Sequence, residues 1–381
     1  MKDLQNPSDI CAHMGDDYDR FLGAIVPPLF QNSLFTRKHE NYGYSYTRIN
    51  NPTIELLEKK LAALEHAPAA RVFASGMAAI TATLSSLLKA GDHVLALSSA
   101  YYPVTAFLSR EMTKYGVEVT FLKDFSLEEI EENIRPNTKV FYLESPSSNI
   151  FKVLPLRQIA ARAHENGAIA VIDNTWATPL YQKPLELGID YSIHSATKYL
   201  GGHSDIIGGV VLGDEEHLDG MRNWERSAWG ACMDPFAAWL LTRSLRTLEL
   251  RMERHSNSGM KVARFLQEHP RVKKVYYPGL EENEGHALAE TQMTGYSGLM
   301  SFIPDGDFKA IHDMVKALDV FEEGPSWGGF ESVINTPGVQ DNTEYLEFTG
   351  IPKGLVRISV GLEDSDTLIH DLDRVLNAMP V

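Results

Sequence analysis

The sequence predicts an α/β protein in which a large, mainly parallel sheet is followed by a smaller α+β domain. Between residues 72 and 212, short apolar runs alternate with amphipathic helical stretches, a pattern typical of strands that helices bury on both faces. A long helical region follows at 235–268, and after it strand and helix candidates occur in a different order.

The length and charge of the chain limit its class. Its 381 residues suggest two domains, and a content of 44% hydrophobic and 23% charged residues excludes disorder over most of the chain. The 35 Lys and Arg residues against 51 Asp and Glu residues give a formal net charge of −16, the wrong sign for coating a nucleic acid. No nucleic-acid partner is therefore expected, and an anionic ligand needs positive groups gathered locally.

Cysteine usage and hydropathy indicate the cytoplasm. Only Cys11 and Cys232 are present, which argues against a disulfide framework and a Cys-rich zinc site. No apolar stretch approaches the roughly 18–20 residues of a membrane helix, and no apolar run of a secretory signal follows Met1–Gln5. We expect a cytoplasmic protein with no membrane partner.

In chain order, the first expected element is an arm. Residues 1–50 are irregular and carry Pro27-Pro28 and a cluster of tyrosines, which favours an extended segment. A helix is expected to begin at Asn51, which can cap it, with Pro52 in its first turn. Its apolar residues recur at helical spacing: Ile54, Leu57, Leu61 and Leu64.

The large domain is expected to span residues 51–245 around a seven-stranded sheet. Its strands are predicted at Val72–Ala74, His93–Leu97, Val117–Leu122, Lys139–Leu143, Ile169–Asp173, Tyr191–His194 and Gly209–Leu212. Helices are predicted between them at Met77–Leu88, Leu127–Ile134 and Leu156–Asn166.

The small domain is expected to span residues 246–381, with its boundary inside the helical region Pro235–Glu268. Strands are predicted at Gly298–Ile303, Val320–Glu323 and Leu355–Val360. Helices are predicted at Phe308–Leu318 and Ser365–Asn377.

Three motifs fall where predicted strands of the large sheet end, and ligands of open α/β sheets bind at that edge. In Phe73-Ala74-Ser75-Gly76-Met77, backbone N–H groups at a helix start, together with Ser75, suit a phosphate. The second motif delivers Asp173 to a strand end after three apolar residues. Taken alone, the first pattern is more often a plain tight turn, and the second more often a helix cap or loop residue.

The third motif places Lys198 after a strand and before a Gly-rich loop, flanked by Ser195 and Thr197. Most lysines are solvated surface groups, but an amine that loses water has a lowered pKa and attacks aldehydes. Together the motifs describe a site for pyridoxal 5′-phosphate (PLP), with Lys198 as the Schiff-base lysine and Asp173 keeping the ring nitrogen protonated. The residues expected to hold its phosphate are Ser75, Gly76, Met77, Ser195 and Thr197.

Other interpretations remain open from the residues alone. Gly324-Pro325-Ser326-Trp327-Gly328 matches the G-x-S-x-G nucleophile elbow of hydrolases, with acidic residues and His370 downstream, although no helix pattern follows it. A non-enzymatic PLP-binding protein is expected to lack Lys198 or Arg357, and both are present. His194 and His203 flank Lys198 without H-E-x-x-H spacing, so no metal is expected.

Six segments resemble one known family. They are Tyr46–Thr53, Ser75–Met77, Asp173–Thr175, Ser195–Tyr199, Gly328–Ser332 and Leu355–Asp364. Through them the whole chain resembles the Cys/Met-metabolism, or cystathionine γ-synthase-like, family of PLP-dependent enzymes. The resemblance implies the aspartate-aminotransferase-like fold, known as the PLP-dependent transferase fold type I. It also implies a homotetramer built from two active dimers.

The resemblance further implies the roles of particular residues. Tyr46 and Arg48 reach the phosphate of the neighbouring subunit's cofactor. Tyr101 stacks on the pyridine ring and serves in catalysis. Arg357 grips the substrate's α-carboxylate, for which a bidentate guanidinium is well shaped, and Ser332 lies near the Schiff-base lysine.

Within the family, several segments look like the bacterial cystathionine β-lyases. Ser148, Trp327 and the turn Ala100–Pro103 match that form, and Ser148 and Trp327 are expected in the substrate pocket. Pro325 and Asn50–Thr53 depart from it. The implied reaction is β-elimination of an amino-acid thioether, L-cystathionine, to homocysteine, pyruvate and ammonia. The alternative is γ-elimination or γ-replacement on cystathionine or another homoserine-type amino acid.

Overall fold

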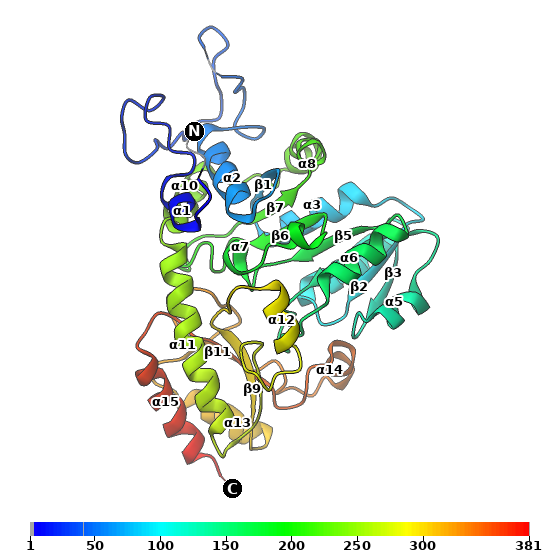
Figure 1. Ribbon diagram of the computed structural model, residues 1–381, viewed down its shortest axis with the longest axis vertical. Coiled ribbons are helices and arrows are strands. Elements are labelled where there is room, and N and C mark those ends of the chain that lie inside the picture. The colour runs from blue at the N-terminus through cyan, green and yellow to red at the C-terminus, as the bar shows by residue number, and fades with distance from the viewer. Residues whose placement is uncertain (1–3, 41, 381) are drawn as a thin grey trace.

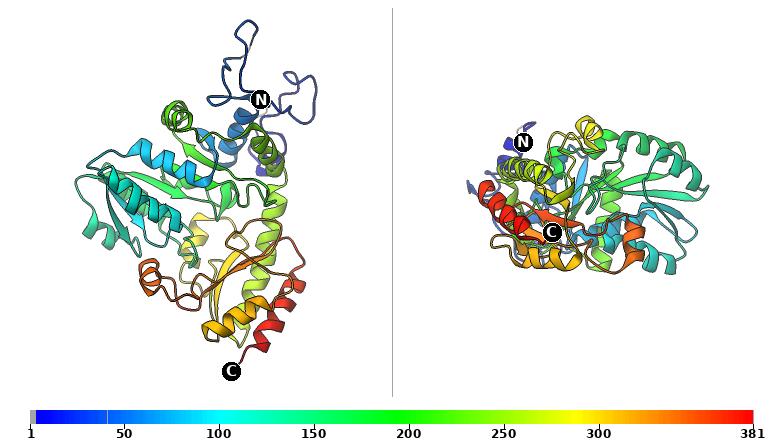
Figure 2. Two further views of the ribbon diagram at one scale, coloured as in Figure 1. Left: turned by 180° about the vertical axis from the view of Figure 1, so that it is seen from behind. Right: turned by 90° about the horizontal axis from the view of Figure 1, so that it is seen from below.

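The computed structural model describes residues 4–40 and 42–380, which form two sheets and a long helix that runs beside the smaller one (Figure 1). This helix, α11 (Leu248–Glu268), extends from the side of the N-terminal arm toward the C-terminal end of the molecule (Figures 1 and 2). Within the two described stretches, no helix combines the length and apolar character needed to cross a membrane.

The larger sheet has seven strands in the order β1-β7-β6-β5-β4-β2-β3. Only β7 runs antiparallel to its neighbours, β1 and β6, so the predicted seven-stranded, mainly parallel sheet is confirmed. The strands are β1 (Ala69–Phe73), β2 (His93–Leu97), β3 (Glu118–Leu122), β4 (Thr138–Glu144), β5 (Ile169–Asp173), β6 (Tyr191–Ser195) and β7 (Gly209–Gly213).

Helices cover both faces of the larger sheet, which explains why its strands are apolar along most of their length. On β7, Val211 packs in the core that includes residues of α3 and α6, whereas Val210 and Leu212 pack with α2 and α10. The helices of this region are α2 (Pro52–Glu65), α3 (Gly76–Leu87), α4 (Tyr102–Ala106), α5 (Leu127–Asn133), α6 (Leu156–Glu165), α7 (Thr178–Tyr181), α8 (Glu215–Met221), α9 (Ser227–Trp229) and α10 (Pro235–Leu245), with short helical segments η1 (Phe107–Met112), η2 (Pro184–Leu187) and η3 (Arg222–Arg226).

The first helix of the larger sheet region begins as predicted. The side chain of Asn51 accepts a hydrogen bond from Thr53 N at 2.9 Å, and Pro52 occupies the first turn of α2. The helix ends at Glu65, and His66 directly after it adopts the left-handed conformation.

The smaller sheet has five strands in the order β10-β11-β12-β9-β8. The strands are β8 (Val272–Tyr276), β9 (Leu299–Pro304), β10 (Glu322–Glu323), β11 (Val333–Asn335) and β12 (Val356–Ser359). The remaining helices of this half are α12 (His286–Gln292), α13 (Phe308–Lys316), α14 (Thr343–Thr349) and α15 (Ser365–Ala378).

Two strands of the smaller sheet were not predicted. β8 is an edge strand whose central residues, Lys273 and Lys274, are exposed, so it has no buried apolar run. β11 has only three residues. The predicted strand Val320–Glu323 is also shorter in the structure, because only Glu322 and Glu323 pair with β11.

Each of the two sheets packs against an apolar core of its own. Phe302, Ile358 and Leu372 belong to the core of the smaller sheet, and two other clusters cover the larger one. The predicted helical region Pro235–Glu268 is divided after Leu245 into α10 and α11. The proposed domain boundary between residues 245 and 246 coincides with this break and stays a prediction.

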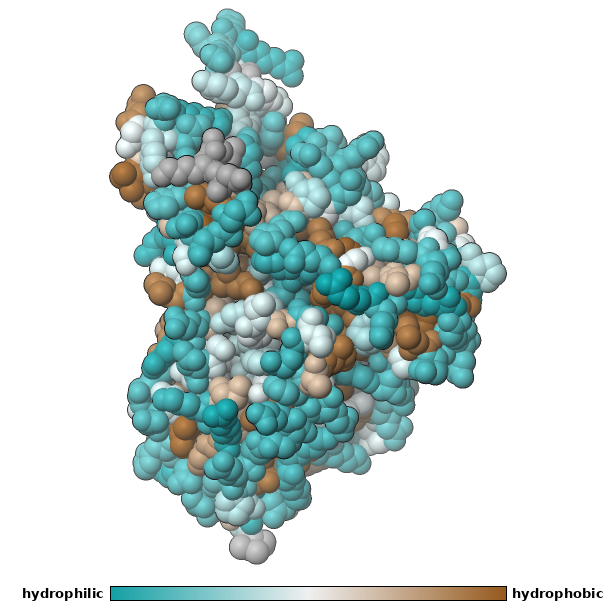
Figure 3. Space-filling view, viewed as in Figure 1, coloured by the Kyte–Doolittle hydropathy of each residue, from teal (hydrophilic) through white to brown (hydrophobic). Residues whose placement is uncertain are grey.

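Residues 4–40 and 42–50 form an arm that contains the helix α1 (Pro7–His13), which was not predicted. An isolated bridge between Leu34 and Tyr46 joins two parts of the rest, which projects away from both sheets (Figures 1 and 2). Apolar side chains are exposed on this arm, with Leu22 99% and Ile25 72% accessible, and brown atoms gather there in Figure 3. Apolar side chains this exposed are typical of a surface that meets another chain.

Helix α1 is attached to the core through a fully buried lysine. Lys60 Nζ, on α2, donates to Ile10 O at 3.0 Å and to Cys11 O at 2.7 Å. Burial lowers the pKa of Lys60 to about 8, and the charge of Asp16 partly opposes this shift. Ile10 O also accepts from Met14 N at 3.1 Å, so the amine adds a second donor to that carbonyl and supplies one to Cys11 O in the last turn of α1.

Lys60→Met is expected to loosen α1 without disturbing the sheets. The variant keeps an apolar stem but removes the amine that donates to Cys11 O and to Ile10 O, which leaves Ile10 O with Met14 N alone, at a cost of about 1–3 kcal/mol. Hydrogen–deuterium exchange in residues 7–13 should become about 5–150-fold faster, as measured by mass spectrometry. The control is Lys59→Met, which removes an exposed partner of Glu55. Equal exchange in wild type and Lys60→Met would show that Lys60 does not hold the helix.

Candidate functional site

The motifs predicted from separate segments meet at one edge of the larger sheet. β5 ends in Asp173, β6 ends in Ser195, and Lys198 follows in the next turn. β1 ends in Phe73, and Ser75 caps α3 directly after it. Because β1, β5 and β6 run in the same direction, their carboxyl ends lie at the same edge.

Lys198 is a partly buried amine held by the loop between β10 and β11. Its Nζ donates to Ser326 Oγ at 2.9 Å and lies 5.4 Å from the centre of the Trp327 ring. Burial, followed by the charge of Arg357, lowers the pKa of Lys198 to about 8, while Asp173 opposes the shift. About a tenth of this amine is therefore neutral at pH 7, far more than for a solvated lysine.

The same loop also touches the backbone of Lys198. Gly328 adopts a φ of +81°, and a Cβ on it would lie 2.8 Å from Tyr199 N and 3.2 Å from Lys198 Cα. Gly328 N donates to Ser359 Oγ, on β12, at 3.2 Å. Only glycine combines a positive φ with the absence of a Cβ that would clash with the Lys198–Tyr199 backbone. Its contact joins the turn after β6 to the smaller sheet.

Asp173 is a buried carboxylate with one oxygen available to a ligand. Thr175 donates to Oδ1 from its backbone N at 3.0 Å and also from its hydroxyl. Oδ2 accepts no hydrogen bond from the described part of the chain. Burial raises the pKa of Asp173, against the lowering effects of Thr175, His194 and Lys198.

The turn between β1 and α3 is shaped for an anion. Ser75 Oγ accepts from Ala78 N at 3.0 Å, while the N–H groups of Gly76 and Met77, in the first turn of a 12-residue helix, have no intrahelical acceptor. A Cβ on Gly76 would lie 2.9 Å from Ser195 Oγ, so the turn sits directly against that hydroxyl. A helix start with free N–H groups and an adjacent hydroxyl binds phosphate.

Arg357 comes to this edge from the smaller sheet. It lies on β12 and donates to Pro325 O at 2.6 Å, and it forms no ion pair with a carboxylate of the described residues. Burial lowers the pKa of Arg357 to about 10, which leaves it charged at neutral pH. Its remaining N–H groups can therefore receive a ligand carboxylate.

Tyr101 lies at the start of α4 and is 49% exposed. Its backbone N donates to Glu144 Oε2 at 2.7 Å. Burial raises the pKa of its hydroxyl, the charges of Asp173 and Glu144 raise it further, and Arg357 lowers it. Tyr101 is thus within electrostatic reach of both Asp173 and Arg357.

Three further predicted residues lie at or beside this edge. Ser148 Oγ donates to Glu144, a buried carboxylate that was not predicted as a site residue. Thr197 Oγ1 accepts from Gly208 N at 3.1 Å. Trp327 meets Tyr199 edge to face, with ring centres 5.5 Å apart. The cofactor and substrate roles of these residues stay predictions.

Ser326, and not Ser332, is the serine in contact with Lys198. Ser332 is fully buried, donating from Oγ to Glu363 Oε2 at 2.9 Å and accepting from Gly361 N at 2.9 Å. Its substrate role stays a prediction. Ser326 was expected only as an alternative hydrolase nucleophile and as the first residue of the Ser326–Gly329 segment that resembles the β-lyase form, and its contact with Lys198 was not predicted.

The arm residues Tyr46 and Arg48 are not brought to this edge within the chain. The Arg48 guanidinium lies 5.4 Å from the centre of the Tyr46 ring, both side chains are exposed, and the arm projects away from the sheets (Figure 1). Their predicted action on a neighbouring subunit's cofactor stays a prediction.

The described residues have neither the strand–turn–helix geometry of a hydrolase nucleophile elbow nor the ligand geometry of a metal site. Ser326 lies in an irregular loop between β10 and β11, whereas a nucleophile elbow joins a strand to a helix. His194 is buried on β6 against Glu65, and His203 Nδ1 lies 2.7 Å from Gly201 O. Among residues 4–40 and 42–380, no group of three or more His, Cys, Asp and Glu side chains is placed to hold a metal ion.

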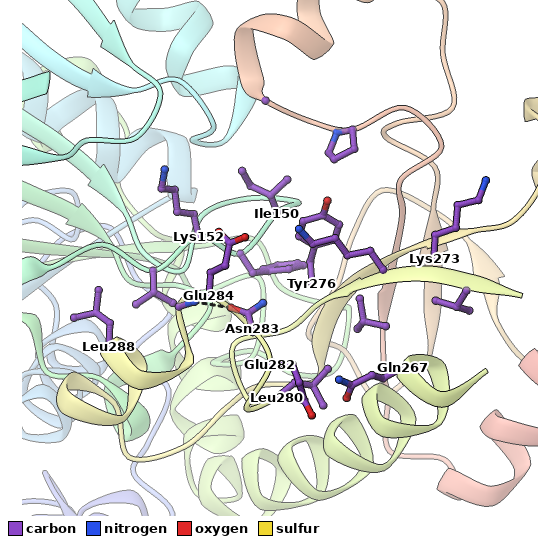
Figure 4. A pocket seen from close by; sticks show the side chains of 18 residues that line it. Ile150, Lys152, Gln267, Lys273, Tyr276, Leu280, Glu282, Asn283, Glu284 and Leu288 are labelled. Carbon is purple, nitrogen blue, oxygen red and sulfur yellow. Dashed lines mark hydrogen bonds between the residues drawn. The ribbon is translucent and has the colours of Figure 1, made fainter. Parts of the chain in front are cut away.

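A cavity of about 680 Å³ lies elsewhere in the molecule (Figure 4). It is bounded by residues 150–153, after β4, by β8 and by the segment before α12, and its lining includes Lys152, Tyr276 and Glu284. None of its lining residues is Lys198, Asp173 or Arg357, so this cavity is distinct from the edge described above.

Known proteins resemble this chain along nearly its whole length. The family model described as "Cys/Met metabolism PLP-dependent enzyme" matches residues 8–377. L-methionine gamma-lyase of Fusobacterium nucleatum subsp. nucleatum is 40% identical over 370 residues, covering 93% of this chain and 94% of that protein. Cystathionine beta-lyase of Lactococcus lactis subsp. cremoris is 38% identical over 372 residues, covering 96% and 97%. The crystal structure of metB from Corynebacterium glutamicum has a TM-score of 0.94 at 34% identity and covers 98% of both chains.

These comparisons confirm the predicted fold type I and the PLP cofactor. The residues present fit that cofactor. Lys198 offers an amine of lowered pKa, Asp173 Oδ2 is free to receive a ring N–H, and the Ser75–Met77 turn would cradle a phosphate.

Asp173→Asn is expected to lower kcat/KM by about 100-fold or more, equivalent to about 3 kcal/mol. The reason is that a neutral amide does not hold a proton on the cofactor's ring nitrogen. Steady-state kinetics and the visible spectrum of the purified protein measure the effect. Asp205→Asn, at an exposed position, serves as the control. Activity within twofold of wild type would reduce Asp173 to a structural group.

Gly328→Ala is expected to lower both cofactor retention and activity, because its Cβ would meet the backbone of Tyr199 at 2.8 Å and its φ disfavours alanine. A loss of at least about tenfold in kcat/KM is expected. The matched control is Gly324→Ala in the same loop, where a Cβ meets only a Val333 methyl at 3.4 Å. Similar results for the two variants would argue against the close contact.

Proposed function

Because this chain belongs to the Cys/Met metabolism family of PLP-dependent enzymes, we propose that it is a carbon–sulfur lyase that carries out β-elimination on L-cystathionine. The observation that supports the lyase chemistry best is the Lys198 amine, of lowered pKa, at one edge with Asp173 and Arg357. The products would be homocysteine, pyruvate and ammonia.

When bound, PLP supplies an aldehyde that joins covalently to amines and a ring that accepts electron density from the substrate's Cα. Lys198 would hold the cofactor through its Nζ and, once displaced by the substrate amine, take the Cα proton. Its pKa of about 8 suits an amine that must both accept and donate a proton near neutral pH. Lys198 or the Tyr101 hydroxyl would then protonate the departing sulfur.

Arg357 would fix the substrate by its α-carboxylate. Its guanidinium donates to Pro325 O and forms no ion pair with a carboxylate of the described residues. A ligand carboxylate would therefore supply the missing ion-pair partner of Arg357. With the carboxylate fixed there and the substrate amine in the place that Lys198 leaves, the Cα–H would be oriented toward the freed lysine that removes its proton.

The side chains next to the Lys198 amine support the choice of β-elimination. Trp327 and Ser326 stand next to the amine, and this Ser-Trp-Gly-Gly segment resembles the β-lyase form. Ser148 supports the same choice. A pocket of this kind distinguishes substrates that differ by one methylene by only about 10–200-fold, so slower γ-elimination is expected as a side activity.

The second candidate is γ-elimination as the main reaction. It is favoured by the 40% identity to an L-methionine gamma-lyase, slightly above the 38% identity to a cystathionine beta-lyase. Pro325, where the β-lyase form carries tyrosine, and Asn50–Thr53 support it as well. This reaction needs a second deprotonation, at Cβ, which Lys198 would also perform.

The assembly is proposed to be a homotetramer made of two active dimers. The exposed arm, with Leu22 99% and Leu34 70% accessible, carries Tyr46 and Arg48 away from its own Lys198 (Figure 1). A second copy that covers these apolar residues would receive Arg48 at its phosphate site. Two free cysteines, Cys11 and Cys232, agree with the proposed cytoplasmic location.

Incubation with L-cystathionine should yield chiefly pyruvate. The keto acid is identified by chromatography of its hydrazone, with Lys198→Ala as the inactive control. Pyruvate supports β-elimination, because its three carbons are the carboxylate carbon, Cα and Cβ on the side of the sulfur with the shorter chain. A product that is mainly 2-oxobutanoate would replace the β-lyase proposal with the γ-lyase one.

Arg48→Ala and Lys198→Ala proteins should complement each other when mixed. Each is expected to be weakly active or inactive alone, but a mixed dimer holds one intact site. Random exchange of equal amounts should recover about a quarter of wild-type activity, since half the dimers are mixed and each has one good site of two. Absence of recovery after verified subunit exchange would indicate that each site is built within one chain.

A further inference from the structure

A second buried carboxylate stands next to Asp173. Glu144 ends β4 and lies in register opposite Asp173 at the end of the neighbouring parallel strand β5. Both are 8% exposed. Neither forms an ion pair with a cation of the described residues, so the chain buries two adjacent acids without a matching salt bridge.

Both oxygens of Glu144 are engaged by residues of the site. Oε2 accepts from Tyr101 N at 2.7 Å, at the start of α4. Oε1 and Ser148 Oγ form a short hydrogen bond. Glu144 thus connects the tyrosine expected to stack on the cofactor ring with the serine expected in the substrate pocket.

The surroundings of the two acids differ. Asp173 Oδ1 receives two hydrogen bonds from Thr175, and the charges of His194 and Lys198 favour its anion. Glu144 faces Asp173 on β5, Tyr101 directly before α4, Tyr142 on its own strand and, at longer range, Arg357 on β12. Burial, and then the charge of Asp173, raises the pKa of Glu144 to about 8.

Two adjacent buried carboxyl groups hold a shared proton more readily than two charges. Both acids accept hydrogen bonds, but only the Asp173 anion is favoured by the neighbouring charges of Lys198 and His194, so the proton belongs on Glu144. A hydroxyl both donates and accepts, so Ser148 Oγ can receive a hydrogen bond from protonated Glu144 Oε1 at the same short separation. Tyr101 N–H then remains on Oε2.

We propose that Glu144 is the neutral member of a carboxyl pair with Asp173, and that it positions Tyr101 and Ser148 at the cofactor. Glu144 is a positioning residue, since it acts through these two neighbours. The pair then carries one negative charge, on Asp173, where a ring N–H⁺ would meet it. This inference rests on the site residues of the proposed function.

Glu144→Gln tests the protonation state because the amide imitates a protonated carboxyl. Its oxygen accepts from Tyr101 N, and its NH₂ donates to Ser148 Oγ. At about pH 6.5 the variant holoenzyme should match wild type within about threefold in the dissociation constant of PLP and show the same visible absorption band. Glu128→Gln, at an exposed position on α5, is the charge-matched control. A cofactor constant raised more than about tenfold in Glu144→Gln alone would overturn the proposal.

Glu144→Leu tests the positioning. It keeps the bulk but removes both acceptors, and is expected to weaken PLP binding at least about tenfold. Glu144→Ala replaces it if circular dichroism shows that the leucine variant does not fold. Wild-type PLP affinity in the folded variant would overturn the positioning role.

Asp173→Asn is measured in parallel, so that failures can be told apart. A changed visible band in Asp173→Asn, with Glu144→Gln unchanged, is the result expected. If the PLP dissociation constant or visible band of Glu144→Gln differs from wild type, and the visible band of Asp173→Asn is also changed, only the role of Glu144 is overturned. An unchanged band in Asp173→Asn overturns the site on which the proposed function rests, and this inference with it.

Discussion

The burial of one amine is the constraint on which the site depends. Lys198 lies in the turn after β6 and is closed in by residues 326–328 of the smaller sheet's loop, which bring a hydroxyl, an aromatic ring and a glycine backbone against it. The loss of water lowers its pKa to about 8. The reactivity of the lysine is thus produced by contact between the two halves of the chain.

The larger sheet contributes by placing polar side chains from several strands at one edge. Parallel strands must be connected by crossovers, so their carboxyl ends collect polar residues from distant segments, here Asp173, Glu144 and the Ser75 turn. The smaller sheet supplies Arg357 on β12 and the loop that closes over Lys198. A substrate held between them would contact both sheets, which ties catalysis to their relative placement.

Much of the fold could be read from local patterns. The seven strands of the larger sheet and the cap at Asn51 were predicted because burial on both faces and helix starts leave strong local signals. The strands β8 and β11 were missed because an exposed edge and a three-residue strand carry little of that signal. Helix α1 was missed because its attachment depends on Lys60, about 50 residues away in the chain.

The sequence by itself determined the chemistry available. It placed Lys198, Asp173 and Ser75 at strand ends, since these positions follow from apolar runs a few residues long. Only the tertiary structure decided which groups meet there. It selected Ser326 over Ser332 as the partner of Lys198, and it set Glu144 beside Asp173. Those contacts depend on strand register and on packing between segments more than 100 residues apart in the case of Ser326, and no local pattern encodes them.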